Sequence, residues 1–172
     1  MFISRCALIV SGVVGTIFGG IGAASAASPT IGSLSVTLTI ISDCQIAAGS
    51  TLAFGSHGVL AADLTATADL SITCTPDASY FIALDAGANE LTTDDVDTRR
   101  MKANTSDYIG YQLYKEFAHS NVWGNSGSAR VAGTGTGSPV VSTVYGVVPV
   151  ASPPIAYPTG SYSDAVAVTI SF

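Results

Sequence analysis

Charged side chains are scarce in this chain of 172 residues, where Asp, Glu, Lys and Arg together make up 10% of the sequence. Acidic residues outnumber basic ones, with 12 Asp and Glu against 6 Lys and Arg. A surface with so few cations offers little to a phosphate backbone, so the composition argues against nucleic acid as a partner. A free cytosolic protein usually depends on charged side chains for solubility, whereas an extracellular assembly tolerates their scarcity better.

Helical periodicity is also missing, because no segment sustains an apolar spacing of 3.6 residues between helix caps. Short alternating stretches separated by glycine and proline replace it, which predicts an all-β antiparallel sandwich. The predicted strands cover residues 51–54, 68–75, 80–85, 99–103, 108–117, 140–150 and 162–172. The glycine-rich stretch at 124–139 is expected to be a loop without a core element.

Patterns that carry catalysis or bind metals are absent as well. There is no Gly-x-Ser-x-Gly elbow, and neither His57 nor His119 has a neighbouring motif that would give it acid-base work. The acidic run Asp94, Asp95 and Asp97 lacks the glycine turn and distal glutamate of an EF-hand, so we expect a solvated loop there. We therefore predict a protein without catalytic residues, metal or cofactor.

The first 26 residues are expected to be a secretory signal peptide. Arg5 supplies the positive start, residues 7–22 the apolar stretch, and Ala24-Ser25-Ala26 the cleavage site. A membrane anchor fits less well, because glycines interrupt a stretch that is short for a crossing of about 20 residues. No later segment could cross a membrane. The mature chain, 27–172, carries five cations and twelve carboxylates, a net charge of 5 − 12 = −7, and its length suits one domain.

Cysteine is limited to three positions, and Cys6 is lost with the signal peptide. Cys44 and Cys74 remain, an even number in an exported chain, so we expect them to form a disulfide. The missing Cys-x₂-Cys spacing argues against a zinc site. A bridge between positions 30 apart should contribute roughly 3 to 4 kcal/mol by restricting the unfolded chain.

Two alternating segments stand near the ends of the mature sequence. Residues 31–40 place apolar and hydroxyl side chains on opposite faces, the apolar ones being Leu34, Val36, Leu38 and Ile40. Residues 162–172 alternate in the same way and run to the last residue, so nothing after them could pair with that strand. One unfinished edge and one spare strand predict an exchange of strands between subunits.

Short motifs spread along nearly the whole mature chain carry a family resemblance. They are Ile-Ser-Asp-Cys ending at Cys44, Phe54-Gly55, Ile72-Thr73-Cys74-Thr75, Tyr80-x-Ile82-x-Leu84-Asp85-x-Gly87, Arg100-Met101, Tyr111-Gln112-Leu113-Tyr114, Trp123-Gly124, and the alternating end from Pro158 to Phe172. In this order they resemble the spore coat U domain family, which includes the Csu-type pilins of archaic chaperone-usher pili.

The resemblance implies an immunoglobulin-like antiparallel β-sandwich at residues 41–172 that lacks its last strand. A periplasmic pilus chaperone fills the gap first, and the N-terminal segment of a neighbouring pilin subunit fills it later, with an outer-membrane usher in the pathway. The donor segment would be 27–40, with Leu34, Val36, Leu38 and Ile40 as donor side chains. The strand beside the groove, which also binds the chaperone, would present Val166, Val168, Ile170 and Phe172.

The function expected from the resemblance is that of a structural subunit of a surface pilus that supports adhesion and biofilm formation. Two alternatives stay open. One is a secreted spore-coat or matrix protein of the same family. The other is a β-sandwich module that binds a glycan through Trp123 and the tyrosines.

Overall fold

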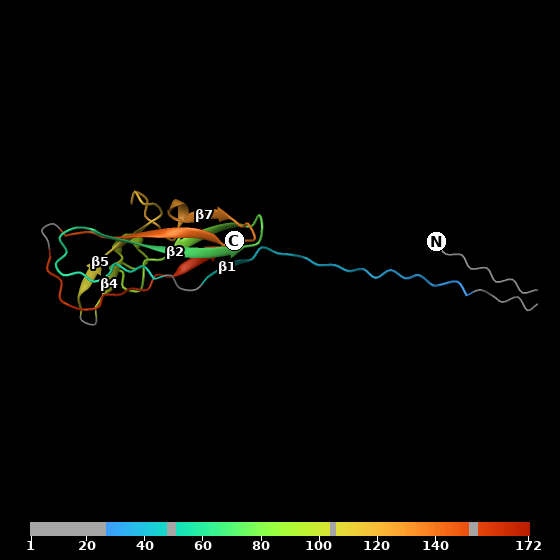
Figure 1. The fold of residues 1–172 in the computed structure, drawn as a ribbon, viewed down its shortest axis with the longest axis horizontal. Helices are drawn as coiled ribbons and strands as arrows, with labels where there is room; N and C mark the ends of the chain where they lie inside the picture. The colour runs from blue at the N-terminus through green and yellow to red at the C-terminus, as the bar shows by residue number, and fades with distance from the viewer. Residues whose placement is uncertain (1–26, 48–50, 104–105, 152–154) are drawn as a thin grey trace, which may run out of the picture. The chain divides into compact units, whose positions relative to one another are not determined.

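The computed structural model describes residues 27–47, 51–103, 106–151 and 155–172. The predicted signal peptide, residues 1–26, lies outside the described residues. The chain divides into two units, residues 1–38 and 39–172, a division that falls inside the predicted donor segment. In the first unit, residues 27–38 form no helix or strand and every one of them is exposed (Figure 1).

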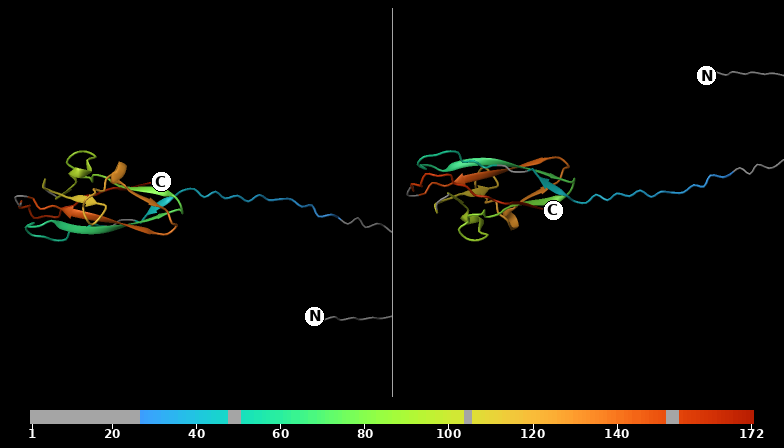
Figure 2. Two further views of the ribbon diagram at one scale, coloured as in Figure 1. Left: turned by 90° about the horizontal axis from the view of Figure 1, so that it is seen from above. Right: turned by 90° about the horizontal axis from the view of Figure 1, so that it is seen from below.

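Four strands of the second unit form one antiparallel sheet in the order β1 (Cys44–Ile46), β2 (Leu64–Cys74), β8 (Val140–Val148) and β6 (Gln112–Tyr114). The long pair β2 and β8 runs from Leu64 opposite Val148 to Ile72 opposite Val140. Figures 1 and 2 show these two strands as neighbouring long arrows. Their pairing is the longest one among the described residues.

A second antiparallel sheet has the order β7 (Val131–Thr134), β3 (Ser79–Leu84) and β9 (Val168–Ser171). The strands β4 (Arg100–Lys102) and β5 (Tyr108–Gly110) pair separately, and two short 3₁₀ turns, η1 (Val96–Thr98) and η2 (Gly127–Ala129), complete the elements. The described part of the chain contains no α-helix. The predicted all-β antiparallel class is confirmed.

The core lies between the two main sheets and follows the alternation of the sequence. On β2, Leu70, Ile72 and Cys74 are buried, as their shared parity predicts. Trp123 is fully buried, and its Nε1 donates a hydrogen bond of 3.0 Å to the Ile82 carbonyl of β3. Further buried members come from both sheets and from the β5–β6 region, namely Tyr80, Ile82, Leu84, Ile109, Tyr111, Leu113, Val144 and Val148. Burying such side chains supplies roughly 1.5 to 3 kcal/mol each, which stabilises the sandwich.

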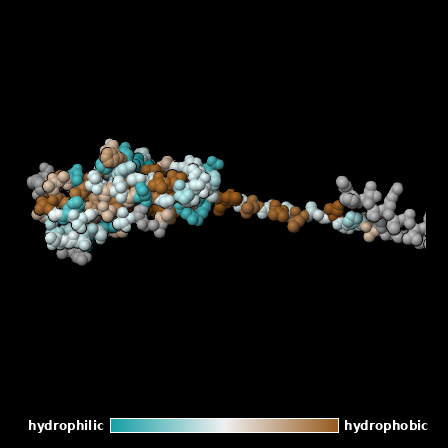
Figure 3. Space-filling model, in the orientation of Figure 1, coloured by the Kyte–Doolittle hydropathy of each residue, from teal (hydrophilic) through white to brown (hydrophobic). Residues whose placement is uncertain are grey.

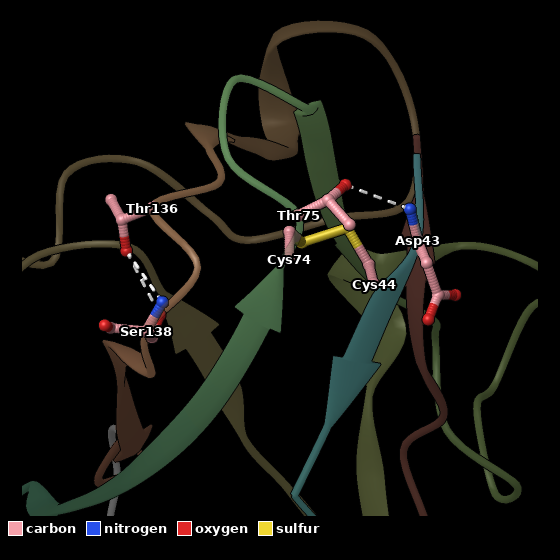
Figure 4. The surroundings of a disulfide bond; sticks show 6 residues. All are labelled: Asp43, Cys44, Cys74, Thr75, Thr136 and Ser138. Carbon is pink, nitrogen blue, oxygen red and sulfur yellow. Dashed lines mark hydrogen bonds between the residues drawn. A yellow bond between two sulfur atoms is a disulfide. The ribbon is translucent and has the colours of Figure 1, made fainter. Parts of the chain in front are cut away.

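The predicted disulfide is present. Cys44 of β1 lies directly opposite Cys74 of β2, with 4.1 Å between their Cα atoms (Figure 4). Backbone bonds continue the pairing on both sides, from Thr75 N to Asp43 O at 2.9 Å and from Ala47 N to Ser71 O at 2.9 Å. The bridge therefore fastens the three residues of β1 to a long central strand.

The predicted loop at 124–139 is wrong in one respect, because it contains β7 and contributes to the core. Val131 packs against the core cluster, and Gly133 lies opposite Tyr80 of β3. A Cβ at Gly133 would collide with the Tyr80 ring, so this glycine permits the close approach. Glycine content thus reflects packing here rather than a loop.

Several strands also differ from the prediction: β1 was not predicted, and β2 begins at Leu64 rather than at residue 68. Residues 51–54 form no strand, although Leu52 and Phe54 turn toward the core. The stretch 108–117 divides at Tyr111 into β5 and β6, which pair with different partners. The alternation of 162–172 yields a regular strand only at β9. In these last three stretches side-chain alternation persists where the backbone lacks a regular ladder partner.

Candidate functional site

An apolar groove with a volume of about 1160 Å³ opens beside β9. Its lining residues belong to the second unit and come from both sheets, from the segment 51–60 and from the segment 156–164. The larger aliphatic and aromatic members are Leu52, Phe54, Val59, Leu60, Leu64, Leu70, Leu84, Met101, Ile109, Tyr111, Leu113, Val144, Val148, Tyr157, Tyr162, Val166 and Val168. A groove this apolar is suited to receive hydrophobic side chains.

The β9 side of the groove combines half-buried side chains with an open backbone edge. Val166, Val168 and Ile170 are half-buried and pack against the core, while the residues between them are exposed. The Ala167 carbonyl accepts a hydrogen bond of 3.1 Å from the N–H of Asp85, the residue that follows β3. Antiparallel pairing alternates, so the N–H and C=O groups of Val168 and Ile170 point away from β3.

No strand pairs with that outer edge of β9 among the residues that the structure describes. A row of main-chain donors and acceptors on an open edge, next to an apolar groove, is a site for adding another strand.

Two carboxylates hold the chain in register as it approaches β9. Asp85 Oδ1 accepts from the N–H groups of Gly87 at 2.9 Å and Ala167 at 2.8 Å. Asp164 accepts from the Tyr111 hydroxyl at 2.8 Å and from Asn89 Nδ2 at 2.8 Å. Burial, and then the hydrogen bond to Asp164, raise the pKa of Tyr111 above its ordinary value of 10.0. The phenol therefore stays a hydrogen-bond donor at neutral pH.

The opposite side of the groove is the segment 51–60, which lies over β8. Leu52 and Phe54 reach Gly146 so closely that a Cβ there would stand 2.8 Å from Leu52 Cδ2. The Phe54 carbonyl is 2.6 Å from His57 Nε2, which fixes the turn after it. Residues 51–54 keep inward and outward side chains in alternation without belonging to a sheet.

The four predicted donor side chains are highly exposed. Their exposed fractions are 89% for Leu34, 86% for Val36, 86% for Leu38 and 77% for Ile40. Figure 3 shows apolar and paler residues alternating along this segment. Four aliphatic side chains exposed in one row are unusual for a segment without a partner.

The four predicted groove-edge residues do not all lie alike. Val166 and Val168 line the groove, and Ile170 packs against the core cluster. Phe172 is 57% exposed and does not line it. The structure thus brings the first three together along β9 and its approach.

The structure also shows where Trp123 and the acidic run at residues 94–97 lie. Trp123 cannot stack on a glycan, because it is 0% exposed, so that version of the glycan alternative is wrong. In the acidic run, Asp95 Oδ1 accepts from the Asp97 N–H at 3.0 Å and caps η1. Among the described residues no group of three or more His, Cys, Asp and Glu is arranged to hold a metal ion.

Arg99 is a buried cation that the sequence analysis did not single out. It is 2% exposed, and burial lowers its pKa below the ordinary value. Its Nε donates to the Asp85 carbonyl at 2.9 Å and its Nη1 to Gln112 Oε1 at 2.8 Å. The side chain therefore ties the end of β3 to β6. The alternation of apolar and polar residues could not indicate that Arg99 is buried, because the groups that compensate its charge are main-chain and amide oxygens.

Comparison with known proteins places this geometry in a family. The model of the Spore Coat Protein U domain matches residues 30–169. Protein U of Myxococcus xanthus is 36% identical over 135 residues, covering 73% of this chain and 74% of that protein.

The fold resembles a solved chaperone-usher structure. The crystal structure of the CsuC-CsuE chaperone-tip adhesion subunit pre-assembly complex, from the archaic Csu pili of Acinetobacter baumannii, matches with a TM-score of 0.54 and 24% identity. The match covers 78% of this chain but only 40% of that chain. Within the described residues no helix has the length and apolar character to traverse a bilayer. By sequence and fold, the chain belongs to the Spore Coat Protein U domain family.

Proposed function

We propose that this protein is a structural subunit of a surface pilus, assembled by the chaperone-usher pathway through strand donation between subunits. The observation that carries the proposal is the apolar groove beside the open edge of β9. The groove has a second feature that suits an inserted strand, because the segment 51–60 on its other side also lacks a ladder partner among the described residues.

The donor is the alternating segment that ends at Ile40. Burying its four aliphatic side chains at roughly 1.5 to 3 kcal/mol each gives on the order of 6 to 12 kcal/mol before ordering costs. Main-chain hydrogen bonds to Val168 and Ile170 set the register of the inserted strand. The donor of one copy therefore completes the next copy.

The partners follow from the state of the groove before assembly. An apolar groove beside an unpaired edge promotes aggregation, so a periplasmic chaperone would have to cover it until an outer-membrane usher delivers the subunit. The fibre would then stand on the cell surface and support adhesion and biofilm formation. Its work is polymerisation, with no catalytic step.

A charge in the donor segment provides the first test. Leu38→Asp places a carboxylate on the apolar face, whereas Thr37→Asp places the same charge on the opposite face. Both mature chains should be recovered equally well when a cognate chaperone is co-expressed. Leu38→Asp should abolish multimers in size-exclusion chromatography with light scattering, and Thr37→Asp should retain them. Normal multimers from Leu38→Asp would refute the donor assignment.

A self-complemented chain provides the second test. In it, a copy of residues 31–41 follows Phe172 through a short Gly/Ser linker, so that one molecule can fill its own groove. It should be a monomer that melts cooperatively. The unmodified mature chain without chaperone should form multimers or aggregates. If the unmodified chain were a stable monomer with residues 31–40 freely mobile by NMR, the proposal would fail.

A coat or matrix protein is the second candidate, and the family model and the resemblance to Protein U favour it. Strand donation could operate in either assembly. Immunogold electron microscopy of the producing cells distinguishes the two, since a pilus gives label along thin fibres and a coat gives an even layer.

A further inference from the structure

A cluster of aromatic rings lies on the outer face of the four-stranded sheet, away from the groove lining. Tyr114 of β6 and Tyr145 of β8 are cross-strand partners, and the turn after β6 adds Phe117 and His119. The His119 ring stands 5.2 Å from the Tyr114 ring and 6.5 Å from the Tyr145 ring, and the Phe117 ring stands 6.4 Å from the Tyr145 ring. We call these four residues the aromatic platform.

Phe117 is the exposed member of the platform, with 80% of its surface accessible. Single exposed apolar residues are common, but this ring stands 6.0 Å from the His119 ring and 6.4 Å from the Tyr145 ring, so it is part of a larger aromatic surface that a ligand could cover.

The turn that carries Phe117 is braced from within. Glu116 Oε1 accepts from Ser120 N at 2.9 Å, Asn121 N at 2.8 Å and Asn121 Nδ2 at 2.9 Å. His119 adopts a left-handed φ of 52°, which a non-glycine residue keeps only when its surroundings hold it. The rings are therefore presented in a fixed arrangement before any ligand binds, which lowers the entropic cost of binding.

The surroundings of the platform are polar, and the charged side chains among them are held in hydrogen bonds. On β2 the partner of Tyr145 is Thr67, and on β8 the flanking residues of the same parity are Thr143, whose hydroxyl donates to Asp69 Oδ1 at 2.7 Å, and the buried Val147. Lys115 Nζ donates to the Ser128 carbonyl at 2.7 Å, and Glu116 is occupied by its three donors. Aromatic faces beside hydroxyls, with the nearby charges engaged, complement a neutral ligand that has both apolar faces and hydrogen-bonding edges.

We propose that the aromatic platform binds a neutral polysaccharide. The C–H face of a pyranose ring lies flat on an aromatic face, and its hydroxyls then reach the tyrosine, threonine and histidine edges around it. Sugar units repeated along a chain allow several rings to be used at once. A partner protein fits less well, because the exposed positions of β2 along this face are Thr65, Thr67 and Asp69 rather than aliphatic side chains. The inference is independent of strand exchange, since it uses the opposite side of the sheet.

The test uses the mature chain, with microcrystalline cellulose, chitin and cross-linked dextran as neutral probes and alginate as the anionic control. Binding to at least one neutral probe is expected, with little binding to alginate. Phe117→Ala and Phe117→Leu should both lower that binding about tenfold, because leucine keeps apolar area but loses the ring face. His119→Gly should also lower it, and glycine suits the left-handed backbone there, so folding is kept.

Phe81→Ala serves as the aromatic control. Its ring is 41% exposed on β3 and is covered by Arg130, whose guanidinium lies 4.4 Å from the ring centre. Melting curves confirm that each variant is folded. Three results would overturn the proposal: no binding to any neutral probe, binding that Phe117→Leu preserves, or a Phe117→Ala variant that loses self-association while it still binds the polysaccharide. The last result would assign the platform to a second copy of the chain.

Discussion

Two segments of this protein share one sequence pattern and differ in structure. Residues 34–40 and 166–170 both alternate aliphatic with small polar or small side chains. In the first segment the aliphatic side chains are 77% to 89% exposed and no ladder partner is present among the described residues. In the second they are half-buried and the backbone pairs with β3 along one edge.

The difference teaches that alternation gives a segment the capacity to become a strand, while the partner determines whether it does so. β9 has its partner in β3, and Asp85 and Asp164 fix its register from outside the ladder. The N-terminal segment has the same capacity and no such anchors among the described residues. A groove with one open edge is the place where the two can meet.

The largest effect should come from a charge on the paired segment. Val168→Asp puts a carboxylate into the groove lining beside Leu84, where the described lining side chains include no Lys or Arg and the nearby Arg99 guanidinium already donates to the Leu84 and Asp85 carbonyls. We expect a loss of about 3 kcal/mol or more in the self-complemented chain, because a charge buried without a partner is costly. Thr169→Asp, one position along on the exposed face, is the matched control and should change little. Urea unfolding followed by circular dichroism measures both, and equal losses would contradict the assigned orientation of β9.

Removing the disulfide should have the next largest effect. The double substitution of Cys44→Ser with Cys74→Ser releases a loop of 30 positions, and we expect a loss of about 3 kcal/mol from the greater freedom of the unfolded chain. The same urea experiment checks this in the self-complemented chain. Adding reductant to the unsubstituted protein should reproduce the loss. A reductant effect that persists in the double variant would show that another process is responsible.

The anchor of the β9 approach should contribute less and should depend on pH. Tyr111→Phe removes the hydrogen bond to Asp164 and should cost about 1 kcal/mol at neutral pH. The raised pKa of Tyr111 means that the folded state keeps the phenol proton more tightly than the unfolded state does. Its contribution is therefore complete below pH 10.0 and is lost as the pH rises above that value.

Alkaline titration of melting temperature in the unsubstituted and Tyr111→Phe chains tests this dependence. The unsubstituted chain should lose more stability above pH 10.0 than Tyr111→Phe does. Parallel curves would mean that Tyr111 plays no part in the alkaline transition.

Much of the fold could be predicted from alternation because the core is built from it. Leu70, Ile72 and Cys74 are buried as their parity indicates, and Cys44 meets Cys74 as an even cysteine count in an exported chain indicates. β7 was missed because its one glycine, Gly133, serves close packing against Tyr80 and the strand has too few apolar side chains to mark it. For Trp123 the sequence allowed either core packing or stacking on a sugar, and only the fold, which buries the ring and bonds it to the Ile82 carbonyl, decides between them.

The site could be predicted only in outline. The sequence supplied both alternating segments, and Val166, Val168 and Ile170 face inward as expected. Residues 51–54 resembled an ordinary strand, and only the structure places them across the groove from β9 without a ladder partner among the described residues. Likewise Phe117 belongs to an aromatic cluster only because its ring lies beside that of Tyr145, which is distant in sequence. Contacts between such distant residues are set by topology, which local pattern does not encode.

The smallest effect should come from Leu38→Asp at the N-terminal position of the self-complemented chain, although the same substitution in the appended copy should be disruptive. The self-complemented chain holds residues 31–41 twice, once at the N-terminal position and once after the linker. Leu38→Asp in the N-terminal copy changes an exposed side chain and should alter stability by no more than about 0.5 kcal/mol. The same substitution in the appended copy places the carboxylate in the groove and should cost several times as much. Because composition and net charge are identical in the two variants, any difference in their urea midpoints measures the effect of occupying the groove. Identical midpoints would mean that neither copy occupies it, and the two alternating segments would then have no physical connection.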